Sequence, residues 1–118
     1  MTAQDFEFKL AHLGINSKDA DEGRATAALI EALFGFVCKE GNSSIFCDDQ
    51  FEVMKKPYLG TNGHFAVTTC DADGARRWLE SNGVVFDEST AQYLDNGKLR
   101  LIYAKTEIGG FAFHITQR

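Results

Sequence analysis

Three histidines and one glutamate are the residues of this chain whose types and spacing could hold a metal ion. His12 and His64 each open a similar phrase, HLGINSKDAD and HFAVTTCDAD, and the two phrases align without a gap at an offset of 52 residues. His114 lies in FAFHI near the end of the chain, and Glu52 lies in the corresponding short segment FEVMK. Three imidazoles and one carboxylate suit a first-row divalent metal ion.

The alternation of residues around these four predicts that they face one side of a sheet. Successive side chains of a strand point to opposite faces. Each histidine is followed directly by a large apolar residue, and it shares its own side with small residues such as Gly14, Ala66 and Ala112. The pattern therefore predicts four polar groups converging in a cavity. The alternative is that the histidines are hydrogen-bonded residues of a core that contains water, and that Glu52 is exposed to solvent.

Two successive runs of strand and helix patterns would position these groups. The segment FEFKLAHLGI alternates and predicts a strand, and Ser17 or Asp19 could cap the helix that follows over 21–35. This helix carries one apolar face and has Gly35 as its stop signal. The residues of that face are Ala25, Ala28, Leu29, Ala32 and Leu33. The segments FVCKE, SSIFCDD and FEVMK predict three short strands in a meander.

The same order restarts after breaks at Pro57, Gly60 and Asn62-Gly63. GHFAVTTC predicts a strand, and Asp71 or Asp73 could cap a helix with Ala75, Trp78 and Leu79 on one side, ended by Asn82-Gly83. VVFDEST, AQYLD, KLRLIYAK and FAFHITQR then predict strands, with a type I′ turn at Asn96-Gly97. We therefore predict an α+β fold of one domain over 1–118, built from two βαβββ modules that repeat over 6–56 and 62–118.

Composition narrows the class of protein. The chain has 118 residues and a formal net charge of −5, which disfavours nucleic acid as a partner. No apolar run reaches the ~20 residues of a membrane helix, and no secretory signal is visible, so we expect a cytoplasmic protein without membrane contact. The three cysteines, Cys38, Cys47 and Cys70, show no CxxC spacing, and buried reduced thiols are predicted.

The stretches HLGI, FEVM, NGHFAV and GFAFHI resemble the vicinal oxygen chelate superfamily, which includes glyoxalase I, methylmalonyl-CoA epimerase and extradiol dioxygenases. The resemblance covers nearly the whole chain and implies a cupped sheet and a homodimer. In glyoxalase I the ligand positions carry His, Glu, His and Glu, which fall on His12, Glu52, His64 and His114. The last position departs from that pattern. The expected cofactor is a divalent ion of Zn, Ni, Fe, Mn or Co, because imidazoles and a carboxylate suit such metals.

A closer resemblance is carried by GNSSIF, EVMKKPYLGTNGH, FDESTAQYLDNGKL and EIGGFAFHI. These stretches are similar to the glyoxalase-like domain fused to some 2-keto-3-deoxy-6-phosphogluconate (4-hydroxy-2-oxoglutarate) aldolases. This resemblance implies a setting in sugar-acid or 2-oxo-acid metabolism and supplies no reaction of its own. From the metal-ligand pattern we predict a metal-dependent isomerase or lyase acting on a small 2-oxo or 2-hydroxy acid, with Glu52 or another base moving the proton. The alternatives are an extradiol-type dioxygenase, or a non-catalytic ligand-binding or aldolase-accessory module. It stays open whether the site lies in one subunit or is shared between two.

Four further residues are candidates for substrate binding, namely Ser44, Met54, Tyr58 and Tyr103. For Ser44 the role of a turn former is favoured over that of a ligand donor, and Tyr103 could line either the pocket or the core. Lys55 and Lys56 follow Glu52 closely. They could reach an anionic substrate at the mouth of the cavity, or they could be solvated residues of a loop.

Overall fold

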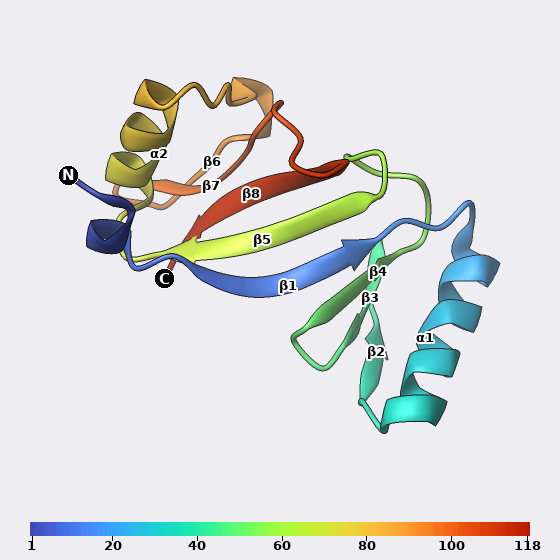
Figure 1. Ribbon diagram of the computed structural model, residues 1–118. Coiled ribbons are helices and arrows are strands. Elements are labelled where there is room, and N and C mark those ends of the chain that lie inside the picture. Colours follow the sequence, from blue (N-terminus) through green and yellow to red (C-terminus); the bar gives the residue numbers. More distant parts are fainter.

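The computed structural model describes residues 1–118 as one eight-stranded mixed sheet with two α-helices and two short 3₁₀ helices (Figure 1). In chain order the elements are η1 (Ala3–Phe6), β1 (Lys9–Ile15), α1 (Ala20–Phe34), β2 (Cys38–Glu40), β3 (Ser44–Cys47), β4 (Phe51–Met54), β5 (Gly63–Thr69), α2 (Ala72–Ser81), η2 (Glu88–Thr90), β6 (Gln92–Tyr93), β7 (Leu99–Tyr103) and β8 (Phe111–Gln117). The predicted α+β class with two βαβββ modules is confirmed. Neither helix is long and apolar enough to cross a membrane.

The two halves of the chain contribute one half of the sheet each. The strand order is β2-β3-β4-β1-β5-β8-β7-β6, so the first strand of each half lies at the centre and the remaining strands follow outward. β1 and β5 pair antiparallel, β1 and β4 pair parallel, and β5 and β8 pair parallel. Figure 1 shows β1, β5 and β8 running side by side between α2 at one end and α1 at the other. The first and last strands of each half are thereby neighbours.

Both α-helices begin and end as local sequence signals indicate. The side chain of Asp19 accepts a hydrogen bond from the Glu22 amide at 2.8 Å, so Asp19 rather than Ser17 caps α1. α1 ends at Gly35, whose φ of 72° suits a residue without a side chain. Asp71 rather than Asp73 caps α2 through the Gly74 amide at 3.0 Å.

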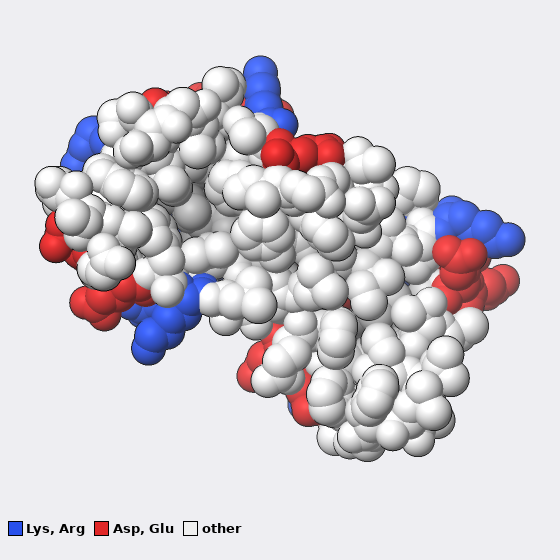
Figure 2. Space-filling view, viewed as in Figure 1, with Lys and Arg blue, Asp and Glu red and all other residues white.

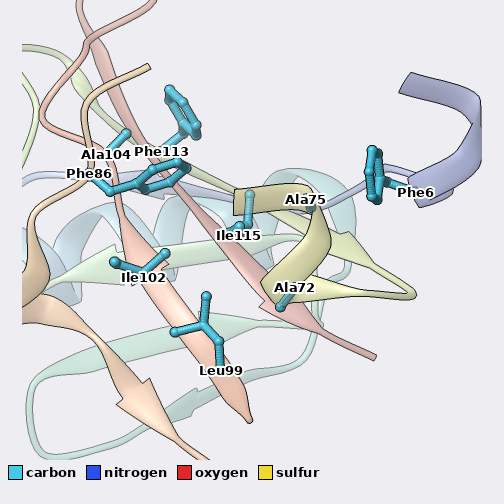
Figure 3. Packing of buried hydrophobic residues seen from close by; sticks show 9 residues of the cluster. All are labelled: Phe6, Ala72, Ala75, Phe86, Leu99, Ile102, Ala104, Phe113 and Ile115. Atoms are coloured by element: carbon cyan, nitrogen blue, oxygen red, sulfur yellow. The ribbon is translucent and has the colours of Figure 1, made fainter. Parts of the chain in front are cut away.

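The larger hydrophobic core lies between α2 and the second half of the sheet (Figure 3). Its buried residues are Phe6, Ala72, Ala75, Phe86, Leu99, Ile102, Ala104, Phe113 and Ile115. The core under α1 is smaller and consists of Ala27, Ile45, Cys47 and Val53. The half of the molecule that contains α1 therefore buries less of its own apolar surface than the other half.

The apolar face predicted for α1 points to solvent in the single chain. α1 instead contacts the sheet through Gly23 and Ala27, which are buried, and a Cβ on Gly23 would lie 3.0 Å from the Met54 carbonyl oxygen. Because the smallest residues make the closest contact, the helix lies close to the strands, and apart from the partly buried Ile30 its larger residues are left outside. Leu29 and Leu33 are 58% and 65% exposed. The prediction that α1 packs on the sheet through this apolar face is therefore wrong.

Two predictions for the second half are also wrong in detail. VVFDEST is not a strand, because Phe86 makes only an isolated bridge to Ala104 and Glu88–Thr90 form η2. The Asn96-Gly97 turn exists, but only Gly97 has a positive φ. The Leu94 amide donates to the Lys98 carbonyl at 2.8 Å, which closes a three-residue loop instead of a type I′ turn.

The prediction that all three cysteines are buried reduced thiols is wrong. Cys38 and Cys47 form a disulfide between β2 and β3, and Cys70 is free and exposed. The two bonded residues are direct partners in the antiparallel register of the hairpin, with their Cα atoms 4.0 Å apart. This pairing depends on the register of two strands, which cysteine spacing alone does not reveal.

The disulfide can be tested by counting thiols. Unfolded under non-reducing conditions, the protein should show one reactive thiol, from Cys70, and three after reduction. Reduction should lower the free energy of unfolding by roughly 2–3 kcal/mol, because the cross-link closes a short loop in the unfolded chain. Cys70→Ser should remove the one reactive thiol without changing stability. Three thiols before reduction would contradict the disulfide.

Candidate metal centre

The four polar residues lie in two adjacent rows that cross the middle of the sheet. In one row Glu52 of β4, Gly14 of β1 and His64 of β5 are successive partners. In the other row His12 of β1 pairs with Ala66 of β5, which pairs with His114 of β8. The two rows are two residues apart along the strands, so all four side chains point to the same face. All four come from one chain.

The side chains of these residues meet in space. His64 Nε2 lies 3.0 Å and His12 Nε2 lies 3.4 Å from Glu52 Oε1. Each of the three histidines offers a ring nitrogen, and these three nitrogens lie within 4.8 Å of one another. His12 is only slightly exposed, and His64 and His114 are buried. The structure thus brings together, in one centre, all four residues that the sequence singled out.

Gly14 provides the room that this centre needs. A Cβ atom on Gly14 would lie 2.0 Å from Cε1 and 2.1 Å from Nδ1 of His64. The imidazole therefore lies directly over the glycine backbone, in a place that no other residue would leave free. In β1 the register shifts between Leu10 and His12. Such an irregularity redirects the side chains of a strand, and it lies directly before the first histidine of the centre.

Glu52 is ionised in this setting. Burial would raise its pKa, but the contacts with two imidazoles and the Ser44 hydroxyl outweigh burial and hold the pKa well below its usual range. Ser44 Oγ donates to Glu52 Oε2 at 2.8 Å, which leaves Oε1 to the histidines. Ser44 therefore positions the carboxylate, and it lies on β3 rather than in a turn.

His114 is a neutral imidazole. Burial first, and then the neighbouring His12 and His64, lower the pKa of His114 to about 3. Its Nδ1 lies 2.8 Å from Thr116 Oγ1, so Nε2 is the nitrogen left for the centre. A neutral ring oriented through its other nitrogen is the form in which histidine binds metal ions. The sequence-based prediction did not include Thr116 in the site, although Thr116 lies on the same side of the strand as His114.

The donor set fits a divalent metal ion. His64 Nδ1 is buried without a hydrogen-bond partner, and His12 Nε2 has only its 3.4 Å contact with Glu52, which is costly for buried polar atoms unless something binds them. Imidazole nitrogens and a single carboxylate match the preferences of Zn, Fe, Co and Ni, whereas magnesium and calcium take mainly oxygen ligands. The arrangement of three imidazole rings around one ionised carboxylate is therefore suited to hold such an ion.

A cavity of about 320 Å³ opens beside Glu52. Its lining residues are Ser43, Glu52, Met54, Lys56, Tyr58 and Tyr103. Three of the four residues predicted for substrate binding thus line it, whereas Ser44 does not. The Tyr103 ring lies 4.7 Å from that of His114, and the Tyr58 ring lies 6.0 Å from that of His64. The cavity therefore adjoins the histidine cluster.

Two residues near the centre were not among the site residues predicted from the sequence. Phe46 packs edge-on against His12 at 5.4 Å between ring centroids, and Ser43 lines the cavity. Phe46 pairs with Glu52 across β3 and β4. Strand alternation places Phe46 on the same side of β3 as Ser44, so the alternation of residues in the sequence could have identified Phe46.

Gly14→Ala should displace His64 and weaken metal binding at least about tenfold, because ligand orientation is typically worth 10–100-fold in affinity. Titration of the purified protein with Co²⁺, followed by visible absorbance, measures this. Gly41→Ala is the matched control, since Gly41 also lacks a positive φ and lies in the β2–β3 hairpin. Unchanged Co²⁺ affinity in a folded Gly14→Ala protein would contradict the positioning role of Gly14.

Comparisons with known proteins support the fold. No family model matches the chain, and no curated protein matches it. Among solved structures, methylmalonyl-CoA epimerase from Mycobacterium tuberculosis superimposes with a TM-score of 0.60 at 15% identity, over 92% of this chain and 86% of that one. A hypothetical protein from Bacillus halodurans gives 0.64 at 11% identity, over 94% of both chains.

A Streptomyces coelicolor methylmalonyl-CoA epimerase variant in complex with 2-nitronate-propionyl-CoA is also similar. It gives a TM-score of 0.59 at 15% identity, over 92% of this chain and 96% of that one. The epimerases belong to the vicinal oxygen chelate superfamily. At these identities the similarity establishes the architecture, and the chain has the glyoxalase-like fold of those proteins.

Proposed function

We propose that this protein is a divalent-metal-dependent enzyme of the isomerase or lyase type that acts on a small 2-oxo or 2-hydroxy acid. The observation that carries the proposal is the meeting of three imidazoles and one ionised carboxylate beside a cavity. The structural similarity to methylmalonyl-CoA epimerases, which are isomerases by name, supports the reaction class. A cavity of about 320 Å³ lies at the small end of ligand sites and suits a small acid.

His12, Glu52, His64 and His114 would hold the ion. When bound, a divalent ion of this kind polarises two neighbouring substrate oxygens and makes the adjacent carbon more acidic. The chain itself contributes the orientation of the ligands. Ser44 fixes one oxygen of Glu52, and the small residues on the same face keep space above the sheet.

Glu52 is the proposed acceptor of the substrate proton. Its low pKa makes it a weak base, so proton transfer requires a carbon already acidified by the neighbouring carbonyl and the ion. Tyr103 remains protonated, because burial first, and then nearby Tyr58 and Glu52, raise its pKa. The Tyr103 phenol could therefore donate a hydrogen bond to a substrate oxygen in the cavity.

The other functions that the sequence suggested have weaker support. An extradiol-type dioxygenase would place a glutamate where this chain has His114. The non-catalytic or aldolase-accessory module and the aldolase partner rest on sequence resemblance alone. A cytoplasmic location stays a prediction, and the Cys38–Cys47 disulfide is unusual for that compartment.

We also propose that the chain is one domain built from repeats over 6–56 and 62–118. The outward order of strands is the same in both halves of the sheet. The register supports the repeat as well, because His12 faces Ala66 while Gly14 faces His64 across β1 and β5. With an offset of 52 residues, positions 12 and 14 correspond to positions 64 and 66, so a local two-fold axis relates the two pairs.

We propose a homodimer, and the exposed apolar surface on the helix-bearing face supports it. Leu29, Leu33 and Phe34 of α1 are each more than half exposed and form an apolar ridge. On the same face an apolar groove of about 250 Å³ lies beside α2, and Figure 2 shows a hollow there within a surface that is largely uncharged. Its lining residues are Phe8, Phe65, Val67, Leu79, Val84, Ile108, Phe113 and Ile115.

We propose that the α1 ridge of each subunit enters the groove of the other. A two-fold axis lets one ridge and one groove per chain satisfy both subunits, as a closed dimer requires. Exposed apolar patches of this kind mark interaction sites. The small core under α1 supports the same arrangement, because a partner would bury the residues that the chain leaves outside.

Metal content and proton exchange test the enzyme proposal. Protein purified without an affinity tag or chelator should contain near-stoichiometric Zn, Ni, Fe, Mn or Co, and His114→Ala should lose it. With metal bound, the protein should exchange the C3 protons of 2-oxobutyrate with D₂O, as followed by NMR. Glu52→Gln should slow this exchange by about 10²-fold or more, because it removes the proton acceptor.

Glu107→Gln is the control for that experiment, since Glu107 is a carboxylate outside the cluster that hydrogen-bonds Thr61. It should retain both metal and exchange. Protein that contains no metal and takes up none on addition would overturn the proposed function. Stoichiometric metal with no exchange for any small 2-oxo or 2-hydroxy acid would favour the binding-module alternative.

The dimer is tested by molar mass in solution. Light scattering after size-exclusion chromatography should give twice the chain mass for the wild type and the single chain mass for Leu33→Glu, because a buried unpaired carboxylate is costly. Leu94→Glu is the matched control, since Leu94 is exposed in the β6–β7 loop, away from the ridge. A wild-type monomer, or a dimer that survives Leu33→Glu, would contradict this interface.

A further inference from the structure

The cavity beside Glu52 contains one cationic side chain, Lys56. The other lining residues are two tyrosines, a serine, a methionine and Glu52 itself. The carboxylate of Glu52 is already engaged by His12, His64 and Ser44. The cavity thus contains one ammonium group, and the single carboxylate in its wall is directed toward the histidines and Ser44.

Lys56 differs in this respect from the lysine directly before it. The Lys55 ammonium forms a salt bridge with Glu40 and donates to the Gly41 carbonyl at 2.7 Å, and its side chain is only 15% exposed. Lys55 therefore ties β4 to the β2–β3 hairpin. Lys56 makes no salt bridge and no hydrogen bond through its side chain, and it is exposed at the cavity. Of two adjacent lysines, one is structural and the other is free to bind a ligand.

The remaining cationic side chains near the site are not equivalent to Lys56. Lys105 lines a neighbouring cavity of about 190 Å³ together with Asp87 and Glu107, so carboxylates share its surroundings. Tyr103 lines both cavities and lies between them. In a chain with a net charge of −5, an ammonium that has no salt-bridge partner and lies beside the cluster is the local feature that would attract an anion.

We propose that Lys56 binds a second anionic group of the substrate, so that the substrate is a 2-oxo or 2-hydroxy acid with a carboxylate or phosphate at its far end. This inference rests on the proposed function. The first carboxylate of such an acid is used at the metal centre, together with the neighbouring oxygen. A lysine ammonium acts as a point charge and accepts either a carboxylate or a phosphate. Lys56 is thus a specificity-determining residue.

Lys56 and Glu52 line one cavity. Lys56 follows Met54 by two residues just beyond the end of β4, while Glu52 lies within that strand. The cavity joins the carboxylate of the cluster to this lysine, and Tyr58 and Tyr103 contribute to its wall. A ligand that spans the cavity would place its metal-binding oxygens at one end and its second charge at the other.

The test compares three acids that share one metal-binding end, namely 2-oxoglutarate, 2-oxo-4-phosphonobutyrate and the singly charged 2-oxopentanoate. Isothermal titration of the metal-loaded protein should show at least about tenfold tighter binding of one or both doubly acidic compounds than of 2-oxopentanoate, as a charge-assisted hydrogen bond provides. Which of the two binds more tightly identifies the second group. Lys56→Met should abolish the preference by weakening the doubly acidic compounds far more than 2-oxopentanoate.

Lys105→Met is the matched control and should keep the preference, and Lys56→Arg should restore much of it because the charge is retained. Equal affinity for all three acids, or a preference that survives Lys56→Met, would overturn the role of Lys56 while the proposed function stands. If none of the acids binds the metal-loaded protein, both proposals fail. If the protein binds no metal, the proposed function fails independently of Lys56.

Discussion

The buried carboxylate of Glu52 is the constraint on which the centre of the molecule depends. Removing an ionised carboxylate from water is costly unless its lone pairs are satisfied. In this structure two imidazoles approach Oε1 and a serine hydroxyl holds Oε2. These partners come from β1, β5 and β3, so the carboxylate holds strands from both halves of the sheet to one register. Gly14 completes the arrangement, because any side chain there would occupy the place of the His64 ring.

The antiparallel pairing of β1 and β5 determines which residues can meet at this centre. A parallel neighbour on the outer side of each central strand supplies the remaining group, Glu52 from β4 and His114 from β8. The two halves therefore contribute equivalent positions but different chemistry, a carboxylate in one and an imidazole in the other. Neither half contains a complete set of donors, so the centre requires the whole sheet.

The sequence predicted the features that depend on local patterns and failed for those that depend on packing between distant segments. Strand alternation and turn residues were enough to place His12, Glu52, His64 and His114 on one face, and capping residues located both helices. The exposed face of α1 could not be predicted, because an amphipathic pattern does not show whether the same chain or a partner covers it. The absence of a side chain at Gly23 lets α1 approach β4 closely, and this determines which face of α1 contacts the sheet. The Cys38–Cys47 bond and the structural role of Lys55 likewise depend on strand register and on residues far along the chain.

The replacement of a glutamate by His114 alters the charge of the proposed centre. Around a divalent ion, two carboxylates would give a neutral site, whereas Glu52 alone leaves one positive charge. The low pKa of His114 keeps that ring neutral, so it adds no charge of its own. A site with one net positive charge would suit a substrate that binds through a carboxylate and an adjacent oxygen, because the charges of site and substrate would then balance away from bulk water. The free ammonium of Lys56 would balance a second negative charge in the same way. The charges on the two sides of the cavity thus match an acid with two anionic groups better than an uncharged substrate.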